Sequence, residues 1–411
     1  MTQPVTILGA GIVGICTAVS LAERGVAVRV IDRGAPGQET SFGNAGVISP
    51  WSFIPQSLPG TWRNIPQLMF GAARPLSVRL GAWPRMLPWG LHFLRNGTEQ
   101  KTRQAADAMQ LLCAPSVELF ARHLSGTGHD DLLRDSMYVH AFRNGSRANL
   151  GALDYAIRRE KGADLELIGA DALRQTEPAL SSEFQAAILI KGQVRATSPG
   201  RIAQVLADKA QRLGARFIKD EIRAVQRIQA GWRITCTQET YESEQMVLAM
   251  GAWSMEVLRP LGIKLPLMAE RGYHVEFPTP EIGIENSVMD VDGKFVASSM
   301  ESGARFAGQA EFAPIDAPKD PGKQALLTRL AKNAFPGLNT AAPQFWMGRR
   351  PSFPDSLPVL GELQDQKGLF VNFGHSHYGL MMAPKSGEIL ADLLTDRRPN
   401  TDLAAFAAER F

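Results

Sequence analysis

Cysteine is scarce in this chain of 411 residues, which contains only Cys16, Cys113 and Cys236. Three cysteines far apart in the sequence, with no C-x-x-C pair, argue against a disulfide scaffold and against a structural zinc site. His375 and His377 lie close together, but no third ligand is near them in the sequence, so we expect no metal ion. This cysteine usage favours a reducing compartment, and we expect the protein to be cytoplasmic.

The chain also lacks a long apolar run and a strong excess of charge. No stretch of 18 or more uninterrupted apolar residues occurs, which argues against a membrane-spanning helix. The 44 basic and 41 acidic residues give a formal net charge of +3, and there is no long basic run, so nucleic acid is not an expected partner. A chain of this length exceeds what one hydrophobic core usually supports, which predicts two domains.

Acidic residues are absent from residues 51–98, although this segment contains five arginines and four of the seven tryptophans. Tryptophan and arginine without acidic residues suit an anionic surface, so one interpretation is a peripheral contact with the inner face of a membrane. The other interpretation is that the aromatic side chains pack inward and the arginines surround an anionic site. Prolines interrupt any long amphipathic face, which favours the second interpretation.

The first 32 residues follow the order strand, glycine loop, helix, strand. Residues 5–9 predict a buried strand, residues 12–24 a helix, and residues 26–32 a second strand that ends in an acidic residue. The loop has the spacing G-x-G-x-x-G, which allows a tight turn, close approach of a pyrophosphate, and close packing of helix on strand. The acid would accept hydrogen bonds from a ribose, and it opposes the 2′-phosphate that the following arginine would suit. The expected dinucleotide-binding residues are Gly9, Ala10, Gly11, Ile12, Val13, Gly14, Asp32 and Arg33.

Patterns further along the chain predict an α/β fold with two kinds of sheet. Apolar strands at 246–250 and 369–373 suit a parallel, Rossmann-type sheet together with the N-terminal strands. Hairpin patterns over 271–350, with turns at 292–293 and 302–303, predict a mostly antiparallel sheet. We also expect a loop at 40–50, a strand at 136–142, and helices at 101–124, at 199–213 with Ser198 as N-cap, and from about 384 to 394.

Several motifs together resemble the D-amino-acid oxidase superfamily of flavoproteins, and within it the D-amino-acid dehydrogenase and glycine oxidase branches. The similarity covers nearly the whole chain. Besides the glycine loop, it rests on Glu39-Thr-Ser41, Asn44-Ala-Gly46, Ile48-Ser-Pro50, the stretch 249–254 (AMGAWS), Gly348-Arg-Arg-Pro351 with Asp355, Pro358 and Gly361, and Gly374-His375 with Gly379.

The resemblance implies FAD as the cofactor. Some relatives attach FAD through a C-terminal cysteine, which this chain lacks, so we expect noncovalent binding. Residues 1–55, 192–262 and 350–411 would form a discontinuous FAD-binding domain, and residues 56–191 and 263–349 an inserted, mostly antiparallel α+β substrate domain. Backbone N–H groups of residues 377–380 would stabilise negative charge on the reduced flavin. The resemblance adds these residues to the cofactor site: Thr40, Ser41, Asn44, Ala45, Gly46, Val47, Ile48, Gly251, Trp253, Gly348, Arg350, His375, His377, Tyr378, Gly379 and Leu380.

The resemblance also implies an amino-acid substrate whose carboxylate is bound by the arginine directly before a proline, which is Arg350. A guanidinium fork matches a carboxylate, and because side chains alternate along a strand, Arg349 and Arg350 cannot both enter one pocket. A salt bridge at the surface or between domains is the alternative role for Arg350.

Tyr273, His377 and Tyr378 are further catalytic candidates. Either tyrosine hydroxyl could donate to the carboxylate, or either tyrosine could be packed and satisfied elsewhere. His377 stands where the glycine oxidase branch has an arginine, which weakens the case for glycine as substrate. It could tune the protonation of the amine, bind a polar substrate tail, or serve as a structural loop residue.

These residues imply oxidation of the C–N bond of a small amino acid to the imine, by hydride transfer to flavin N5. The substrate would be a D-amino acid or a secondary amino acid such as a D-proline derivative. The electron acceptor would be oxygen, a quinone or another protein. Two alternatives stay open: an FAD-dependent 2-hydroxy-acid dehydrogenase, for which a histidine could be the base, and a flavin-carrying subunit of a larger electron-transfer complex.

Overall fold

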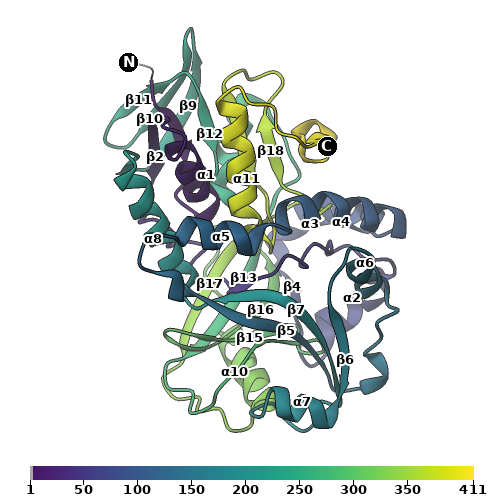
Figure 1. Cartoon of the computed structure of the whole chain (residues 1–411). Helices are drawn as coiled ribbons and strands as arrows, with labels where there is room; N and C mark the ends of the chain where they lie inside the picture. Colours follow the sequence, from purple (N-terminus) through teal and green to yellow (C-terminus); the bar gives the residue numbers. More distant parts are fainter. Residues whose placement is uncertain (1–2) are drawn as a thin grey trace.

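The computed structural model describes residues 3–411, which form one mainly parallel and one mainly antiparallel sheet (Figure 1). The parallel sheet has the strand order β18-β19-β12-β1-β2-β8, and every neighbouring pair except β18–β19 is parallel. Its strands come from both ends and the middle of the chain: β1 (Val5–Leu8), β2 (Val28–Asp32), β8 (Arg216–Lys219), β12 (Met246–Leu248), β18 (Val359–Glu362) and β19 (Leu369–Phe373).

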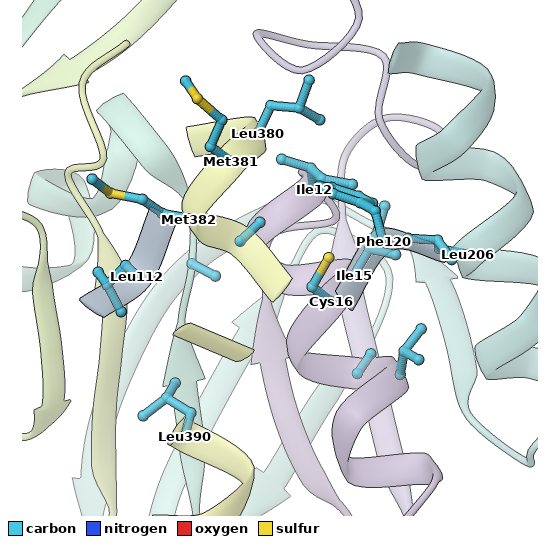
Figure 2. Packing of buried hydrophobic residues seen from close by; sticks show 14 of the residues in the cluster. Ile12, Ile15, Cys16, Leu112, Phe120, Leu206, Leu380, Met381, Met382 and Leu390 are labelled. Carbon is cyan, nitrogen blue, oxygen red and sulfur yellow. The ribbon is translucent and has the colours of Figure 1, made fainter. Parts of the chain in front are cut away.

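Helices α1 (Ile12–Ala22) and α11 (Gly379–Leu394) pack against each other on this sheet (Figure 2). A Cβ atom at Gly387 in α11 would lie 2.8 Å from the backbone nitrogen of Thr17 in α1, so the two helices approach at the closest distance that glycine allows. Helices α4 (Glu99–Cys113), α5 (Ser116–Leu124) and α8 (Pro199–Arg212) complete the cluster, which includes Ile12, Ile15, Cys16, Leu112, Phe120, Leu206, Leu380, Met382 and Leu390.

The second sheet has ten strands and is antiparallel except where β14 pairs with β5 and β4 pairs with β16. The second hydrophobic core of the protein packs against this sheet. It contains buried phenylalanines from β13, from β16 and from the position directly after α10 (Gly322–Ala334). The strands are β3 (Val47–Ile48), β4 (Leu76–Val78), β5 (Leu133–Phe142), β6 (Leu165–Gly169), β7 (Ala186–Ala196), β13 (Met268–Phe277), β14 (Ser287–Asp290), β15 (Phe295–Met300), β16 (Gly303–Phe312) and β17 (Gln344–Ser352).

The remaining elements connect strands of these two sheets. A small antiparallel sheet joins β8 to β12, and two helices occupy the acid-free segment. The elements are α2 (Thr61–Phe70), α3 (Trp83–Asn96), α6 (Leu153–Glu160), α7 (Ala170–Thr176), β9 (Ile222–Ile228), β10 (Gly231–Cys236), β11 (Thr240–Ser243) and α9 (Ser254–Leu258). No helix within residues 3–411 is long and apolar enough to cross a membrane.

The predicted fold class, a Rossmann-type α/β sheet with a mostly antiparallel second sheet, is confirmed. Three local predictions were wrong. Residues 101–124 form two helices, because Pro115 interrupts the backbone bonding, and α11 begins at Gly379, five residues before Pro384. The predicted loop 40–50 contains β3, which pairs with β7. Ser198 does occupy the N-cap position of α8, but its side chain makes no capping hydrogen bond.

Replacement of Gly387 by alanine tests the packing of α1 on α11. The added methyl group would meet backbone atoms of Cys16 and Thr17, so we expect a loss of about 1–3 kcal/mol in the free energy of unfolding. Gly90→Ala in α3 is the matched control, because nothing lies within 4 Å of its added Cβ; this change should stabilise the protein by about 0.5–1 kcal/mol. Thermal unfolding of the holoenzyme measures both, and equal midpoints would contradict the packing argument.

Candidate active site

A cavity of about 930 Å³ extends from the carboxyl ends of β1 and β2 to the second sheet and to helices α2 and α3. Carboxyl ends of parallel strands are where open α/β sheets bind ligands. Of the residues named from the sequence, Ala10, Gly14, Gly46 and Ile48 are not among those that line the cavity. The cavity brings the others together: Gly9, Gly11, Ile12, Val13, Asp32, Arg33, Thr40, Ser41, Asn44, Ala45, Val47, Gly251, Trp253, Tyr273, Gly348, Arg350, His375, His377, Tyr378, Gly379 and Leu380.

The glycine loop forms the tight turn that its spacing predicts. Gly9 has a φ of 108°, a value that favours glycine, and a Cβ atom there would lie 2.5 Å from the carbonyl oxygen of Ala249. A Cβ atom at Gly14 would lie 2.0 Å from the carbonyl oxygen of Gly9, so Gly14 sits beneath the loop. Gly11 is the N-cap of α1 and has more space. The helix N-terminus therefore faces the cavity and offers N–H groups to an anion.

Asp32, at the end of β2, is bonded to the glycine loop. Its Oδ2 accepts a hydrogen bond from the backbone nitrogen of Ala10 at 2.7 Å, and its Oδ1 accepts one from Gly34 at 2.8 Å. The hydroxyl of Ser41 accepts a bond from the backbone nitrogen of Ile12 at 3.0 Å, in the first turn of α1. Asp32 and Ser41 thus fix the backbone that a dinucleotide would contact. A contact of Asp32 with the ribose stays a prediction.

The loop over residues 40–46 is held by backbone and side-chain bonds to the second sheet. The Thr40 hydroxyl donates to the carbonyl of Arg349 at 2.8 Å and accepts from its nitrogen at 3.1 Å. Arg305 donates to the carbonyl oxygens of Phe42 and Asn44 at 3.1 and 2.8 Å, and it pairs with the buried Glu276 at 2.6 Å. These bonds join the loop to β16 and β17, so the loop has a fixed place over the cavity.

Trp253 lies between two arginines at the cavity wall. The guanidinium of Arg33 lies 4.5 Å from its ring centroid and that of Arg349 lies 5.4 Å from it. Arg33 also pairs with the exposed Glu39 at 3.0 Å. Arg349 directs its Nε to the carbonyl of Ile315 at 2.7 Å, away from the partners of Arg350. Arg349 and Arg350 nevertheless both line the cavity, so the expectation that they cannot both enter one pocket was wrong, although their hydrogen-bond partners differ.

The loop before α11 brings a buried histidine to the cavity. His375 is almost fully buried, and burial lowers its pKa to about 3, so the ring is neutral at neutral pH. Its Nε2 has no hydrogen-bond partner among the described residues. Ser376 has a left-handed φ of 49°, and its nitrogen donates to the carbonyl of Pro351 at 2.9 Å. The first N–H groups of α11, which begins at Gly379, have no partner within the helix.

The two tyrosine hydroxyls are satisfied by protein groups. Tyr273 donates to Glu311 at 2.6 Å and stacks on Phe345, and burial followed by this hydrogen bond raises its pKa to about 12. Tyr378 donates to the carbonyl of Ile54 at 2.6 Å, and burial raises its pKa. For both residues this geometry favours the packed alternative over a hydroxyl free for substrate.

Arg350 belongs to a charged cluster around Glu270, a residue that the sequence analysis did not name. The Glu270 carboxylate accepts a bond from Arg350 Nη1 at 3.0 Å and from the Ser352 hydroxyl at 3.1 Å, and its Oε1 lies 2.5 Å from His377 Nε2. Burial alone would raise the pKa of Glu270, but His377 and Arg350 outweigh it and lower the pKa to about 2. Glu270 is therefore ionised at any pH near neutrality.

The pairing of two strands explains why Glu270 was missed. Glu270 in β13 lies directly opposite Arg350 in β17. The predicted strand began at residue 271, so it left out Glu270. Neither segment by itself shows which residue of β13 lies opposite which residue of β17. One feature of the sequence could have indicated Glu270 as a site residue. In a strand that includes it, Glu270 would share a face with Gly272 and His274.

A glycine loop at the head of a parallel sheet, open to a large cavity with a buried charged cluster, defines a dinucleotide-binding oxidoreductase. Residues 4–393 match the family model DAO, described as FAD dependent oxidoreductase. D-amino-acid oxidase of Bradyrhizobium diazoefficiens is 32% identical over 417 residues, which cover 99% of this chain and 98% of that relative. The chain therefore belongs to the DAO family of FAD-dependent oxidoreductases, and FAD is its cofactor.

Solved structures of the same fold agree with this assignment. Glycine oxidase from Geobacillus kaustophilus superposes with a TM-score of 0.77 at 22% identity, covering 100% of this chain and 99% of that chain. L-proline dehydrogenase from P. horikoshii gives a TM-score of 0.77 at 18% identity, with coverage of 100% and 98%. At these identities the likeness shows the fold.

The residues around the cavity fit FAD. The cradle at Gly9 and Gly14 has no room for a side chain, the start of α1 suits a pyrophosphate, and Asp32 lines the same cavity, where it would be available to the ribose. His375, whose Nε2 has no partner among the described residues, and the first residues of α11 also line the cavity and would be available to the flavin ring.

Asp32→Asn tests the role of this carboxylate in FAD binding. Loss of a charged acceptor for the loop and the ribose should raise the Kd of FAD about 10- to 100-fold. Flavin fluorescence during titration of the apoprotein measures the Kd. Glu242→Gln is the control, because Glu242 pairs with Arg233 on β10 and β11 and does not line the cavity. An unchanged Kd in Asp32→Asn would contradict the assignment.

Proposed function

We propose that this protein oxidises the C–N bond of a small amino acid to the imine, with a D-amino acid or a secondary amino acid such as a D-proline derivative as substrate. The proposal assigns residues 1–55, 192–262 and 350–411 to FAD and residues 56–191 and 263–349 to the substrate. The relatives named above are described as acting on a D-amino acid, glycine and L-proline, which supports this class. The observation that carries the proposal is the cluster of Glu270, Arg350 and His377 at the cavity wall.

Arg350 has one side of its guanidinium engaged and the other available to a carboxylate. Its Nη1 donates to Glu270 at 3.0 Å and to the carbonyl of Gln309 at 2.9 Å. Within residues 3–411, Nε and Nη2 make no hydrogen bond. The absence of a side chain at Gly272 leaves the space that the guanidinium occupies, since a Cβ atom there would lie 2.2 Å from Cζ. The Nε–Nη2 edge would then bind the substrate carboxylate with two parallel bonds.

In this mechanism His377 would take a proton from the substrate amine. Amine oxidation requires a neutral nitrogen, and free amino acids carry an ammonium group at neutral pH. The ionised Glu270 favours the tautomer of His377 with its proton on Nε2, which leaves Nδ1 as the acceptor. The side chain of His377 is 38% exposed, so a proton can pass from it to solvent.

When bound, FAD supplies the acceptor for the hydride that leaves the substrate Cα. The chain's own task is to hold the substrate by its carboxylate and to keep its nitrogen neutral, and positioning of this kind accounts for much of enzymatic rate enhancement. We propose that the electrons pass to oxygen, a quinone or another protein. Residues 51–98 would make a peripheral contact with the inner face of a membrane.

Anaerobic mixing of the holoenzyme with a panel of D-amino acids, L-amino acids, imino acids and 2-hydroxy acids tests the substrate class. We expect the visible flavin absorbance to bleach with amino or imino acids. The Glu270–His377 pair could also deprotonate a hydroxyl, so bleaching by hydroxy acids alone would replace the proposal by a hydroxy-acid dehydrogenase. No bleaching by any compound would favour a flavin-carrying subunit.

Arg350→Lys tests the carboxylate contact. Lysine keeps the positive charge beside Glu270 but cannot form two parallel bonds, so kcat/KM should fall about 10- to 100-fold. The fall should lie mainly in KM, because the carboxylate is bound before and during the reaction. Stopped-flow reduction at several substrate concentrations separates the two constants, and a saturable KM equal to that of the wild type would exclude Arg350 as the anchor.

Glu270→Gln tests the role of the Glu270 charge in holding Arg350 and His377. Glutamine has nearly the same shape but no charge, so its bonds to Arg350 Nη1 and His377 Nε2 should weaken and kcat/KM should fall about tenfold. The wild-type carboxylate, with its pKa of about 2, stays ionised near neutral pH. Its stabilising effect on the fold is present above the unfolded value near 4.3 and is lost as pH falls toward 2. Ser352→Ala keeps the charge and should leave kcat/KM nearly unchanged; equal kcat/KM in all three proteins would contradict the role of Glu270.

A further inference from the structure

Exposed apolar side chains gather on α2, α3 and the segment between them. Six of the ten large hydrophobic residues that are exposed in residues 3–411 lie in this stretch, and no residue of α2 is buried. Trp62, Phe70 and Leu80 are 59%, 76% and 88% exposed. The others are Leu87, Leu91 and Leu94. We name these six residues the apolar patch. Of the four tryptophans that we expected to pack inward, Trp89 is buried against Phe312, Trp51 and Trp83 are half-buried, and the expectation was wrong for Trp62.

The segment that carries the apolar patch has positive charge and no negative charge of its own. Arg63, Arg74, Arg85 and Arg95 are exposed, and within the described residues none of them forms a salt bridge. Residues 51–98 contain no acidic residue. Arg79 is the exception, because it pairs with Glu311 of β16 at 2.8 Å. Unpaired arginines beside exposed tryptophan and phenylalanine match a surface that is apolar inside and anionic outside.

The cavity of the active site opens at the apolar patch. Leu87, Leu91 and Leu94 of α3 are exposed and also line the cavity. Ile65 and Leu68 of α2 line the same cavity. The part of the cavity that α2 and α3 line, which we name the apolar arm, is therefore largely apolar, and the charged cluster and the glycine loop line other parts of the same cavity. A solvent-filled entrance for a small charged substrate would not require this lining.

We infer that α2 and α3 form a surface that binds an anionic lipid bilayer and places the apolar arm of the cavity against the lipid. Short amphipathic helices rich in arginine and tryptophan bind in the plane of such an interface, with the apolar face buried about 5–10 Å deep. This inference develops the membrane contact of the proposed function and rests on the surface alone, so it can fail while the proposed substrate class holds.

Co-sedimentation of the holoenzyme with lipid vesicles tests the inference. We expect binding to vesicles of phosphatidylcholine and phosphatidylglycerol at low salt, weak binding to phosphatidylcholine alone, and release near 1 M salt, where the Debye length is about 3 Å. The double change Arg63→Gln and Arg85→Gln should weaken partitioning about 25-fold, at about fivefold for each arginine. The double change Trp62→Ser and Phe70→Ser should weaken it at least about tenfold. None of these four residues lines the cavity.

Arg212→Gln with Leu213→Ser is the matched control. Arg212 is the last residue of α8 and Leu213 is its C-cap, and both are exposed. Helix α8 lies on the left of the molecule in Figure 1, and α2 lies on the right. The control should bind vesicles as the wild type does, and unchanged flavin absorbance and thermal midpoint show that each variant is folded. Three results would overturn the inference: no sedimentation with anionic vesicles at low salt, equal binding by all variants, or self-association of the protein through the apolar patch in place of vesicle binding.

Discussion

The buried carboxylate of Glu270 is the group on which the arrangement of the site depends. An ionised carboxylate out of water costs several kcal/mol unless charged or polar groups compensate it. Its partners come from two parts of the fold: Arg350 and Ser352 from β17 of the antiparallel sheet, and His377 from the loop that opens α11. One charge therefore joins the sheet that would hold the substrate to the helix that would meet the flavin. The relative position of the two follows from satisfying that charge.

Arg350 and His377, which compensate the charge of Glu270, are each held in one arrangement by that contact. Arg350 Nη1 donates hydrogen bonds to Glu270 and to the carbonyl of Gln309, which hold the guanidinium in one orientation. Its Nε–Nη2 edge remains available to a carboxylate. His377 meets Glu270 through Nε2, which determines the nitrogen that can accept a proton. A guanidinium without this support would have many rotamers, and its fixation lowers the entropy lost on binding a carboxylate. Preorganisation of two groups thus follows from the burial of a third.

Local sequence patterns predicted the parts of the fold that depend on short-range chemistry. The glycine loop, its strands and helix α1 were predicted because a turn with φ near 108° at Gly9 and a close approach at Gly14 require glycine. The start of α11 was missed because Pro384 suggested the first turn of a helix. The helix begins five residues earlier, at Gly379, and it packs on α1 through Gly387. Tertiary contacts overrode the local signal there.

The candidate site was predictable where a motif carried it and not where strand register carried it. Arg350 was found because it precedes a proline in a stretch that resembles the family. Glu270 became visible only through the pairing of β13 with β17, since nothing in residues 268–277 states which residue faces which on another strand. The bonds that satisfy Tyr273 and Tyr378 were hidden for the same reason, because their acceptors, Glu311 and the carbonyl of Ile54, are distant in sequence.

The inferred contact with an anionic bilayer would explain why residues 51–98 contain no acidic residue, because the cavity would then have a charged end and an apolar end. Glu270 puts a compensated charge at the inner end, where a carboxylate and an amine would bind, while Leu87 and Leu91 put lipid-like surface at the outer end. An acidic residue on α2 or α3 would pair with the exposed arginines and would repel an anionic surface. The absence of acidic residues therefore preserves the positive charge of this face, and the exposed apolar side chains give it depth.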